Sequence, residues 1–145
     1  MKTSNFLVSK CNYDIVSILD VDDKWEPTKL ENQISFFPEY DVVGTLCQYF
    51  GDNNGCPKLP TGKVNNDTFK KFNPMINSSV LLRKELCLWI DEKLDDYDLW
   101  IRLALQNKKF YNVDKKLTLH RIHKKSYFNN DNNDHVKLLL NKYYN

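Results

Sequence analysis

The sequence predicts an α/β fold in which helices cover a sheet, formed as a single domain over residues 1–145. Its length and its balance of 41% hydrophobic and 28% charged residues are typical of one soluble globular domain. A short, nearly continuous apolar run, DIVSIL at 14–19, is typical of a strand buried on both faces. Segments with helical periodicity separate this run from later strand-like segments, which is the alternation expected of an α/β protein.

The first half of the chain predicts two strands, one helix and one loop. After the strand at 14–19, residues 26–37 carry Pro27 near the start and an apolar stripe of Leu30, Ile34 and Phe37, spaced for one helix face. Residues 41–49, DVVGTLCQY, predict the second strand. The polar stretch at 50–71 contains several glycines and prolines and predicts a long surface loop.

The second half predicts three more strands and three helices. A strand is expected at 78–83, followed by a short helix at 84–94. The helix at 96–107 has the clearest periodicity, and acids crowd its first turn. Two short strands, at 110–113 and 117–122, precede a terminal helix at 135–144.

Charge, hydropathy and cysteine spacing exclude several classes of function. The net charge is +2 with scattered charges, which excludes a nucleic-acid-binding surface. No apolar run is long enough for a transmembrane segment and no signal peptide is evident, so a cytoplasmic location is expected. The cysteines at 11, 47, 56 and 87 form no CxxC pair and predict reduced, mostly buried thiols.

Three acids follow the predicted strand at 14–19 and form the first candidate site. Asp20, Asp22 and Asp23 lie in LDVDD, where the strand should end. Ligands of open α/β sheets gather at the carboxyl ends of strands, and carboxylates on a tight turn suit Mg²⁺ or Mn²⁺ bound to substrate phosphates. The alternative is that one acid caps the following helix and the others are solvated.

A second acidic cluster, LDDYDLW at 94–100, lies at the start of the predicted helix. A carboxylate held against aromatic side chains in a partly dry cleft can act as a general base towards a hydroxyl group. The simpler alternative is that these acids oppose the helix dipole and accept hydrogen bonds from the free N–H groups.

Two histidines and an arginine in LHRIHKKS, at 119–126, form the third cluster. Imidazole is a common metal ligand, and the Arg121 side chain, between His120 and His123, could hold a diphosphate. The alternative is a structural or solvated role for both histidines. The chain has no glycine-rich phosphate loop and no recognisable serine or cysteine nucleophile motif.

Taken in order, four stretches resemble the inverting glycosyltransferase family 2, which has the GT-A fold. These are ILDVDDKWEPTKLENQI, NPMINSSVLLRKE, DDYDLWIRLALQNKKFYNV and LTLHRIHKKS. They are similar to the family's strand with its DxD turn and helix, its acceptor-side stretch, its E-D-Y-D-L-W helix and its R-x-H ending. Asp95 departs from the pattern, since the family more often has Glu there.

The resemblance implies a metal-dependent, inverting hexosyltransferase-like enzyme that uses a nucleotide-sugar donor and a glycan, protein or lipid acceptor. It implies that Asp96 is the catalytic base and that Asp20, Asp22 and His123 bind a divalent metal, Mn²⁺ or Mg²⁺. It further implies donor or diphosphate binding by Asp23 and Arg121. Asp95, Tyr97 and Trp100 would lie on the acceptor side, where the two aromatic residues could equally be part of the core.

The family pattern begins with a nucleotide-binding half that has no counterpart in this sequence. The resemblance therefore implies a truncated GT-A-like, Rossmann-like mixed sheet flanked by helices. Such a sheet would have an exposed edge, which predicts pairing with a second copy or with a separately encoded N-terminal half. A membrane-peripheral location also agrees with this interpretation.

Three functions remain open from the sequence. An active or split glycosyltransferase predicts that the three clusters converge on one cleft. A catalytically inactive remnant that serves as a binding or scaffold module predicts the same fold without donor affinity. An unrelated α/β domain whose acids are only helix caps predicts clusters that lie far apart.

Overall fold

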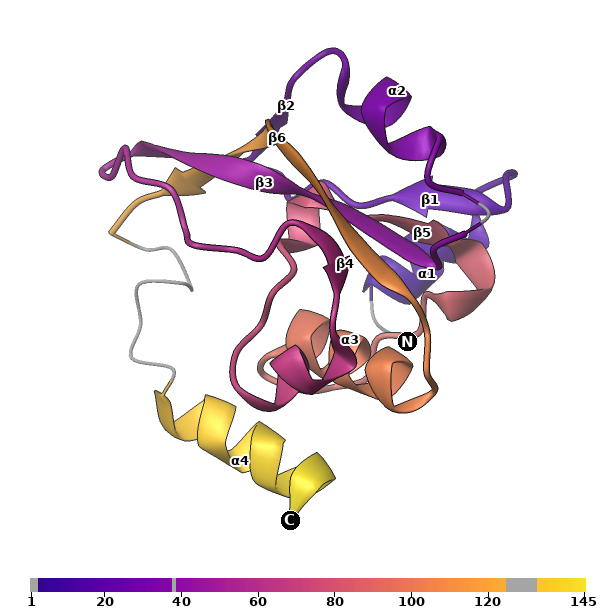
Figure 1. Ribbon diagram of the computed structural model, residues 1–145, viewed down its shortest axis with the longest axis vertical. Helices are drawn as coiled ribbons and strands as arrows, with labels where there is room; N and C mark the ends of the chain where they lie inside the picture. The colour runs from indigo at the N-terminus through magenta and orange to yellow at the C-terminus, as the bar shows by residue number, and fades with distance from the viewer. Residues whose placement is uncertain (1–2, 38, 125–132) are drawn as a thin grey trace.

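The computed structural model describes residues 3–37, 39–124 and 133–145. A mixed six-stranded sheet forms the middle layer. Helix α2 (Lys29–Ile34) lies on one face of the sheet and helix α3 (Asp95–Leu105) lies on the other (Figure 1). The predicted α/β class, a mixed sheet flanked by helices, is therefore confirmed.

The sheet has the strand order β1-β5-β3-β6-β2, and β4 pairs with β6 beside this path. The long strands β3 and β6 run parallel, whereas every other strand pair in the described residues is antiparallel. Strand β1 lies at one edge of the sheet and pairs with β5. The strands are β1 (Ile15–Ser17), β2 (Lys24–Trp25), β3 (Val42–Gly51), β4 (Gly62–Val64), β5 (Leu81–Arg83) and β6 (Phe110–Ile122).

The remaining helices are short, apart from the C-terminal one. The other two α-helices are α1 (Thr3–Ser9) and α4 (Asn133–Tyr144). The described residues also contain three short segments of 3₁₀ helix: η1 (Asn66–Lys70), η2 (Asn77–Ser79) and η3 (Lys84–Leu86). None of the helices in the described part of the chain is long and apolar enough to cross a membrane.

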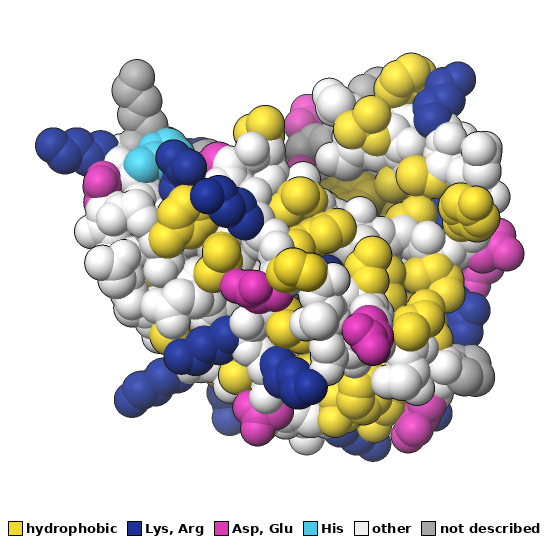
Figure 2. Space-filling model, turned by 90° about the horizontal axis from the view of Figure 1, so that it is seen from above, with side chains coloured by type: hydrophobic (Ala, Val, Ile, Leu, Met, Phe, Trp, Pro, Cys, Tyr) yellow, Lys and Arg dark blue, Asp and Glu magenta, His cyan; other side chains and the backbone are white. Residues whose placement is uncertain are grey.

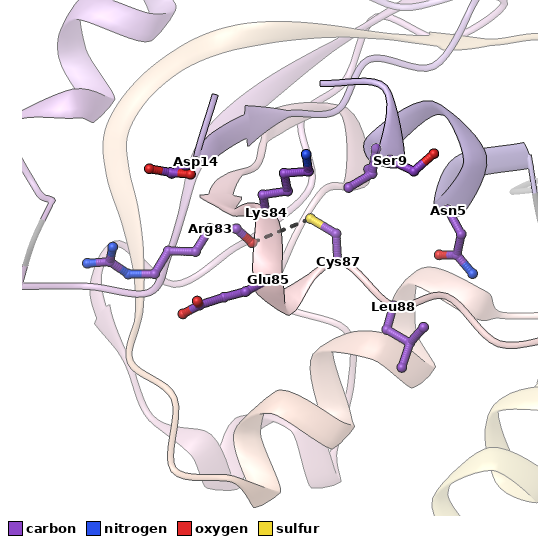
Figure 3. A pocket seen from close by; sticks show the side chains of 9 residues that line it. Asn5, Ser9, Asp14, Arg83, Lys84, Glu85, Cys87 and Leu88 are labelled. Atoms are coloured by element: carbon purple, nitrogen blue, oxygen red, sulfur yellow. Dashed lines mark hydrogen bonds between the residues drawn. The ribbon is translucent and has the colours of Figure 1, made fainter. Parts of the chain in front are cut away.

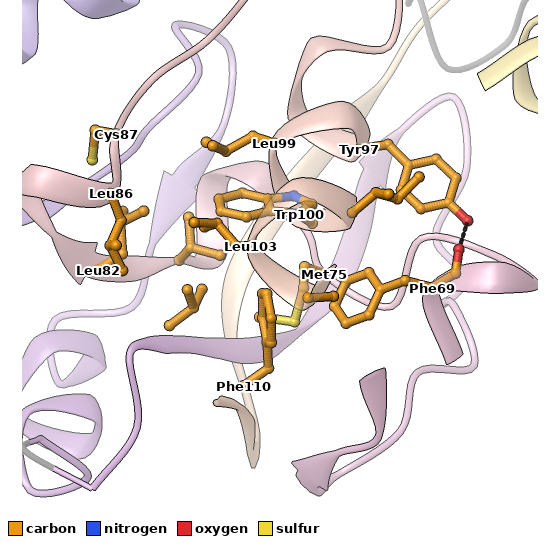
Figure 4. Close-up of a cluster of buried hydrophobic side chains, with 14 of the residues drawn as sticks. Phe69, Met75, Leu82, Leu86, Cys87, Tyr97, Leu99, Trp100, Leu103 and Phe110 are labelled. Carbon is orange, nitrogen blue, oxygen red and sulfur yellow. Dashed lines mark hydrogen bonds between the residues drawn. The ribbon is translucent and has the colours of Figure 1, made fainter. Parts of the chain in front are cut away.

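The core lies between α3 and the sheet, where large side chains are fully buried (Figure 4). Trp100 of α3, Phe110 of β6 and Phe69 of η1 are each 0% exposed. The Tyr97 hydroxyl donates a hydrogen bond of 2.7 Å to the Phe69 carbonyl oxygen. Burial of each large apolar side chain contributes roughly 1.5–3 kcal/mol, so this cluster fixes the position of α3 against the sheet.

Most of the predicted strands and helices are present. The strands predicted at 14–19, 41–49 and 78–83 correspond to β1, β3 and β5, and the helices predicted at 96–107 and 135–144 correspond to α3 and α4. All four cysteines are free, and Cys47 and Cys87 are buried, whereas Cys56 is exposed.

The apolar stripe of the helix predicted at 26–37 is not the buried face of α2. Leu30 and Ile34 are 45% and 50% exposed, whereas Lys29 and Gln33 are buried. Figure 2 shows apolar side chains spread over the face of the molecule on the α2 side. The inner face of α2 is polar because it meets polar groups: Gln33 Nε2 donates to the Ser79 carbonyl oxygen at 2.8 Å.

Three other predicted segments differ from the structure. The stretch 50–71 is not only a surface loop, because it contains β4 and η1 and contributes Val64 and Phe69 to the core. The helix predicted at 84–94 is reduced to the single turn η3. The two strands predicted at 110–113 and 117–122 are one strand, β6, whose register against β3 shifts near Leu46.

Candidate functional site

The acidic turn at 19–23 begins directly after β1, at the end of the strand where the sequence predicted it. The Asp23 backbone N–H donates to the Asp20 carbonyl oxygen at 3.1 Å, which closes the turn. The Asp20 backbone N–H donates to Ser78 Oγ at 3.0 Å, so η2 supports the turn from below. Three carboxylates therefore share one short, hydrogen-bonded turn.

Asp23 joins this turn to β6. Its buried carboxylate accepts hydrogen bonds from His120 Nδ1 at 2.9 Å and from the Arg121 backbone N–H at 2.8 Å. Burial alone would raise the pKa of Asp23, but the hydrogen bonds from His120, Ser78 and Arg121 hold it below its ordinary value. Burial in turn would lower the pKa of His120, but Asp23 raises it above its ordinary value. The visible role of Asp23 is thus to hold the first and third sequence clusters together.

Asp22 of the acidic turn and His123, directly after β6, form an exposed pair. His123 Nε2 lies 3.3 Å from Asp22 Oδ2, and the two side chains are 40% and 39% exposed. The Arg121 Nε donates to the Asp22 carbonyl oxygen at 3.3 Å, and its guanidinium lies 4.9 Å from the Phe50 ring centroid. Figure 2 shows histidine and basic side chains gathered at one end of the face on the α2 side. This end is a positively charged rim beside a carboxylate.

Asp22 and His123 are the residues at this turn that could hold a metal ion. Across the described ranges, no three His, Cys, Asp or Glu side chains are arranged to hold a metal. A carboxylate and an imidazole are nevertheless suitable ligands for Mn²⁺, and divalent ions in phosphate-transfer sites take further ligands from substrate phosphates and water. Asp20, the third predicted ligand, faces a different partner.

Asp20 points towards η2 and α3. Asn77 Nδ2 donates to Asp20 Oδ1 at 3.0 Å. Burial raises the pKa of Asp20 above its ordinary value, and the hydrogen bonds from Ser78 and Asn77 oppose that rise only in part. The nearby charge of Asp23 adds to the increase. Asp20 is therefore a poorly compensated carboxylate between the turn and the second acidic cluster.

Asp96 belongs to the second acidic cluster and lies in the first turn of α3. Like that of Asp20, its pKa is raised. It accepts a hydrogen bond of 3.2 Å from Asn73 Nδ2. Burial raises the pKa of Asp96 to about 6. The charges of Asp95 and Asp20 add to this rise, whereas a hydrogen bond from the Tyr97 backbone N–H opposes it. Asn77 and Asn73, which bond Asp20 and Asp96, come from one segment before β5, so the clusters at 19–23 and 94–100 both contact that segment. A carboxyl with this pKa can accept a proton near neutral pH.

The other predicted acceptor-side residues differ in accessibility. Asp95 is half-buried at the start of α3. Tyr97 and Trp100 are 3% and 0% exposed and belong to the hydrophobic core (Figure 4). Of the two roles left open for these aromatic residues, the structure supports the core role.

Three residues of the site were not singled out from the sequence, and a fourth, His120, was given no specific role there. Asn73, Asn77 and Ser78 all come from NPMINSSV, and each donates to or accepts from a predicted site residue. His120 was noted only as a member of a histidine pair. The signal for the first three was the density of small polar residues immediately before a buried strand, since buried polar side chains require partners.

A hollow of the described surface lies away from these residues (Figure 3). Its volume is about 620 Å³, and it lies between α1, the residue before β1 and the β5–η3 segment. Two of its polar side chains are engaged internally: Asn5 Nδ2 donates to the Trp89 carbonyl oxygen at 2.7 Å, and Lys84 Nζ donates to the Cys11 carbonyl oxygen at 2.6 Å. Asp14 lines this hollow at the beginning of β1, whereas the acidic turn follows the end of β1.

Comparison with known proteins identifies several glycosyltransferases, although no family model matches the chain. The chain is 28% identical over 134 residues to the O-antigen biosynthesis glycosyltransferase WbnJ of Escherichia coli, covering 84% of this chain and 53% of that protein. It is 27% identical over 114 residues to the amylovoran biosynthesis glycosyltransferase AmsE of Erwinia amylovora, covering 70% and 42%. It is 30% identical over 120 residues to the uncharacterized glycosyltransferase MJ1057 of Methanocaldococcus jannaschii, covering 74% and 41%. The chain thus spans about half the length of the curated relatives it matches.

A solved structure has the same fold. The S. aureus TarS fragment 1–349, crystallised in complex with UDP-GlcNAc, matches with a TM-score of 0.68 at 16% sequence identity. The match covers 94% of this chain and 44% of that one. The chain therefore has a glycosyltransferase-like fold, and the curated relatives reported above are named glycosyltransferases.

Proposed function

We propose that this chain carries the transfer site of a glycosyltransferase, which moves a sugar from a nucleotide-sugar donor to a hydroxyl group of an acceptor. The observation that carries the proposal is that hydrogen bonds link all three sequence clusters. Asp23 joins the acidic turn to His120 and Arg121. The segment before β5 bonds both Asp20, through Asn77, and Asp96, through Asn73. The names of the relatives and the UDP-GlcNAc bound by the TarS fragment support the same reaction class.

Asp96 is the proposed general base. Its raised pKa of about 6 leaves it ionised at neutral pH, yet makes it a better proton acceptor than an ordinary aspartate. The carboxylate takes the proton of the acceptor hydroxyl, and the oxygen forms a bond to the anomeric carbon. The bond from that carbon to the donor diphosphate breaks with its electron pair, and attack from the opposite face inverts the configuration.

Asp22 and His123 are the residues proposed to hold a divalent metal, with Asp20 as a less directly placed carboxylate. Mn²⁺ or Mg²⁺ bound there would supply neutralisation of the negative charge on the departing diphosphate. Arg121 contributes a second positive charge at the same place, because its Nε is anchored on the Asp22 carbonyl oxygen. Phe50, beside the guanidinium, restricts the orientations that Arg121 can adopt.

The nucleoside-binding walls are proposed to come from additional polypeptide, in the same protein or in a partner. Two observations support this. Strand β1, which leads into the acidic turn, lies at the sheet edge, and the chain corresponds to about half of its curated relatives. A glycan, a protein or a lipid could serve as the acceptor.

A second candidate function is a binding or scaffold module that has the same fold without transfer. One observation favours it: within the described residues, Asp20, Asp22 and His123 do not form a three-ligand cluster, because Asp20 is bonded to Asn77. The two functions differ in whether the acidic turn binds a nucleotide sugar.

The experiment is calorimetric titration of the purified chain with UDP, GDP and their sugars, with and without Mn²⁺. We expect Mn²⁺-dependent binding of one nucleotide sugar, weakened by at least about tenfold in Asp22→Ala. The matched control is Asp114→Ala, an exposed aspartate on β6. Asp22 is well exposed, so its replacement should leave the fold intact, which circular dichroism would verify. Binding that Asp22→Ala retains would contradict the proposed metal site. Absence of binding by the wild-type chain would mean that this chain alone is an incomplete enzyme or the module.

A further inference from the structure

The C-terminal helix α4 packs against α3 through one apolar and one polar contact region. Leu139 is 5% exposed, and Val136, Leu140, Tyr143 and Tyr144 pack against the core as partly buried side chains. In Figure 1, α4 lies on the α3 side of the molecule, away from the sheet. The proposed transfer chemistry assigns no role to this helix.

The polar contact region is centred on Asp98, whose carboxylate is 0% exposed. Asp98 Oδ2 accepts a hydrogen bond of 2.7 Å from Arg102 Nε, one turn later on α3. Asp98 Oδ1 accepts from the Tyr143 hydroxyl at 2.6 Å and from Lys142 Nζ at 3.3 Å. Two of these three donors therefore come from α4. A buried carboxylate is stable only when it is paired, so α4 supplies part of what keeps Asp98 in the interior.

Asp98 is also part of the first turn of α3, the turn that carries Asp96. The Asp98 backbone N–H donates to the Leu94 carbonyl oxygen at 2.8 Å, the bond that closes this turn. The helix α4 reaches a second element near Asp96 as well, because Lys70 Nζ of η1 lies 5.8 Å from the Tyr144 ring centroid. The chain that follows η1 provides Asn73, the partner of Asp96. Thus α4 contacts α3, which carries Asp96, and η1, which precedes Asn73 in the chain.

We propose that Tyr143 and Lys142 are positioning residues, which hold Asp98 and thereby fix the first turn of α3 with Asp96 in place. Neither residue touches the acidic turn in the structure. Their action is indirect: without them, the Asp98 carboxylate keeps a single side-chain partner, Arg102, and the turn opens towards solvent. The part of this inference that concerns transfer rests on the proposed function, whereas the part that concerns the α3 turn does not.

Hydrogen exchange measured by NMR tests the structural part. Tyr143→Phe removes one hydroxyl, and Lys142→Met removes one ammonium group while keeping a long side chain. We expect the Asp98 amide to exchange about tenfold faster or more in each variant, as loss of a hydrogen bond to a charged group predicts. Lys142→Arg should retain the wild-type rate. The matched control is Lys137→Met, since Lys137 lies on the exposed side of α4, 3.7 Å from Asp134.

A double-variant comparison separates positioning from general destabilisation. In an Asp98→Asn background, Tyr143→Phe should cause little further change at the first turn of α3, because the charged acceptor is gone. The inference is overturned if the Asp98 amide keeps its wild-type protection in both single variants. It is also overturned if protection falls equally in β3 and β6, which would show a global loss of stability.

Kinetics test the functional part on the same variants. Tyr143→Phe should lower kcat for transfer by about tenfold while the affinity for the donor stays unchanged, because Asp96 and not the acidic turn is displaced. An equal loss of donor affinity would contradict this role. If the wild-type chain transfers no sugar, the functional part fails for this chain on its own, whereas the exchange rates still decide whether α4 holds the α3 turn.

Discussion

Replacing Asp96 by asparagine should raise the stability of the folded chain at neutral pH. The folded-state pKa of Asp96 is about 6, against an ordinary value of 3.8. The difference is about two pH units, and each unit is worth about 1.4 kcal/mol, so ionised Asp96 costs up to about 3 kcal/mol. Asparagine carries no charge and retains an oxygen that can accept the hydrogen bond from Asn73. The gain should therefore approach that value above pH 7.

The free energy of unfolding of the wild-type chain should depend on pH through Asp96, whose folded-state pKa is raised. Because the folded pKa lies above the unfolded one, protonation of Asp96 stabilises the wild-type chain as the pH falls from about 7 to about 4. The advantage of Asp96→Asn should shrink over the same range and nearly vanish at pH 4. Urea denaturation at a series of pH values from 4 to 7.5 measures it, with Asp114→Asn as an exposed control on β6. Equal stabilities at pH 7.5, or a difference that does not change with pH, would refute the reasoning.

Two further predictions concern the support beneath the acidic turn. Gly44→Ala should destabilise the chain by about 1–3 kcal/mol in urea denaturation, because the new methyl group would overlap Asn112 Oδ1 and lie 2.8 Å from Met75 Cε. Gly55→Ala, on an exposed loop, should have a small effect, and equal effects would contradict this explanation. Burial lowers the pKa of Lys29 to about 7, and Lys29 Nζ lies 4.2 Å from the Trp25 ring centroid, so the Trp25 fluorescence should titrate near pH 7. The titration should be absent in Lys29→Met; its persistence there would assign it to another group.

Some of the fold could be predicted because the relevant signals are local. The apolar run before Asp20 predicts β1, and the helical periodicity with acids in the first turn predicts α3. The acids at the end of β1 and at the start of α3 occupy the predicted places, because strand ends and helix starts are defined by a few neighbouring residues. The location of the candidate site thus follows from short-range pattern.

The inner face of α2 could not be predicted in this way. Leu30 and Ile34 have the spacing of a buried stripe, yet Lys29 and Gln33 are the buried pair. Gln33 Nε2 donates to the backbone oxygens of Val43 and Ser79, and Lys29 Nζ donates to Ser17 Oγ at 3.1 Å. These partners come from three different strands or turns, so the requirement for polar residues on α2 is long-range. Hydrophobic periodicity contains no information about backbone groups that need donors.

The hydrogen-bond partners of the acids also could not be predicted from local sequence. These partners divide the buried carboxylates into two kinds. Asp23 and Asp98 are buried with cationic partners, His120 for the first and Arg102 with Lys142 for the second. Asp20 and Asp96 receive amide hydrogen bonds from Asn77 and Asn73, and no Lys, Arg or His in the described ranges forms an ion pair with either.

Burial raises the pKa values of Asp20 and Asp96, and the hydrogen bonds from the neutral amides oppose that rise only in part. The first turn of α3 stabilises an acid through its free N–H groups, but the bond from the Tyr97 N–H does not cancel the effect of burial on Asp96. Retaining such charges is therefore costly for the folded chain. Cationic partners would be the stable choice if these acids were only structural, as Asp23 and Asp98 demonstrate. The uncompensated pair is instead what a site requires when the missing positive charge or proton is brought by a ligand. The amide partners therefore strengthen the assignment of Asp96 as the proton acceptor and of Asp20 as its neighbour at the donor side.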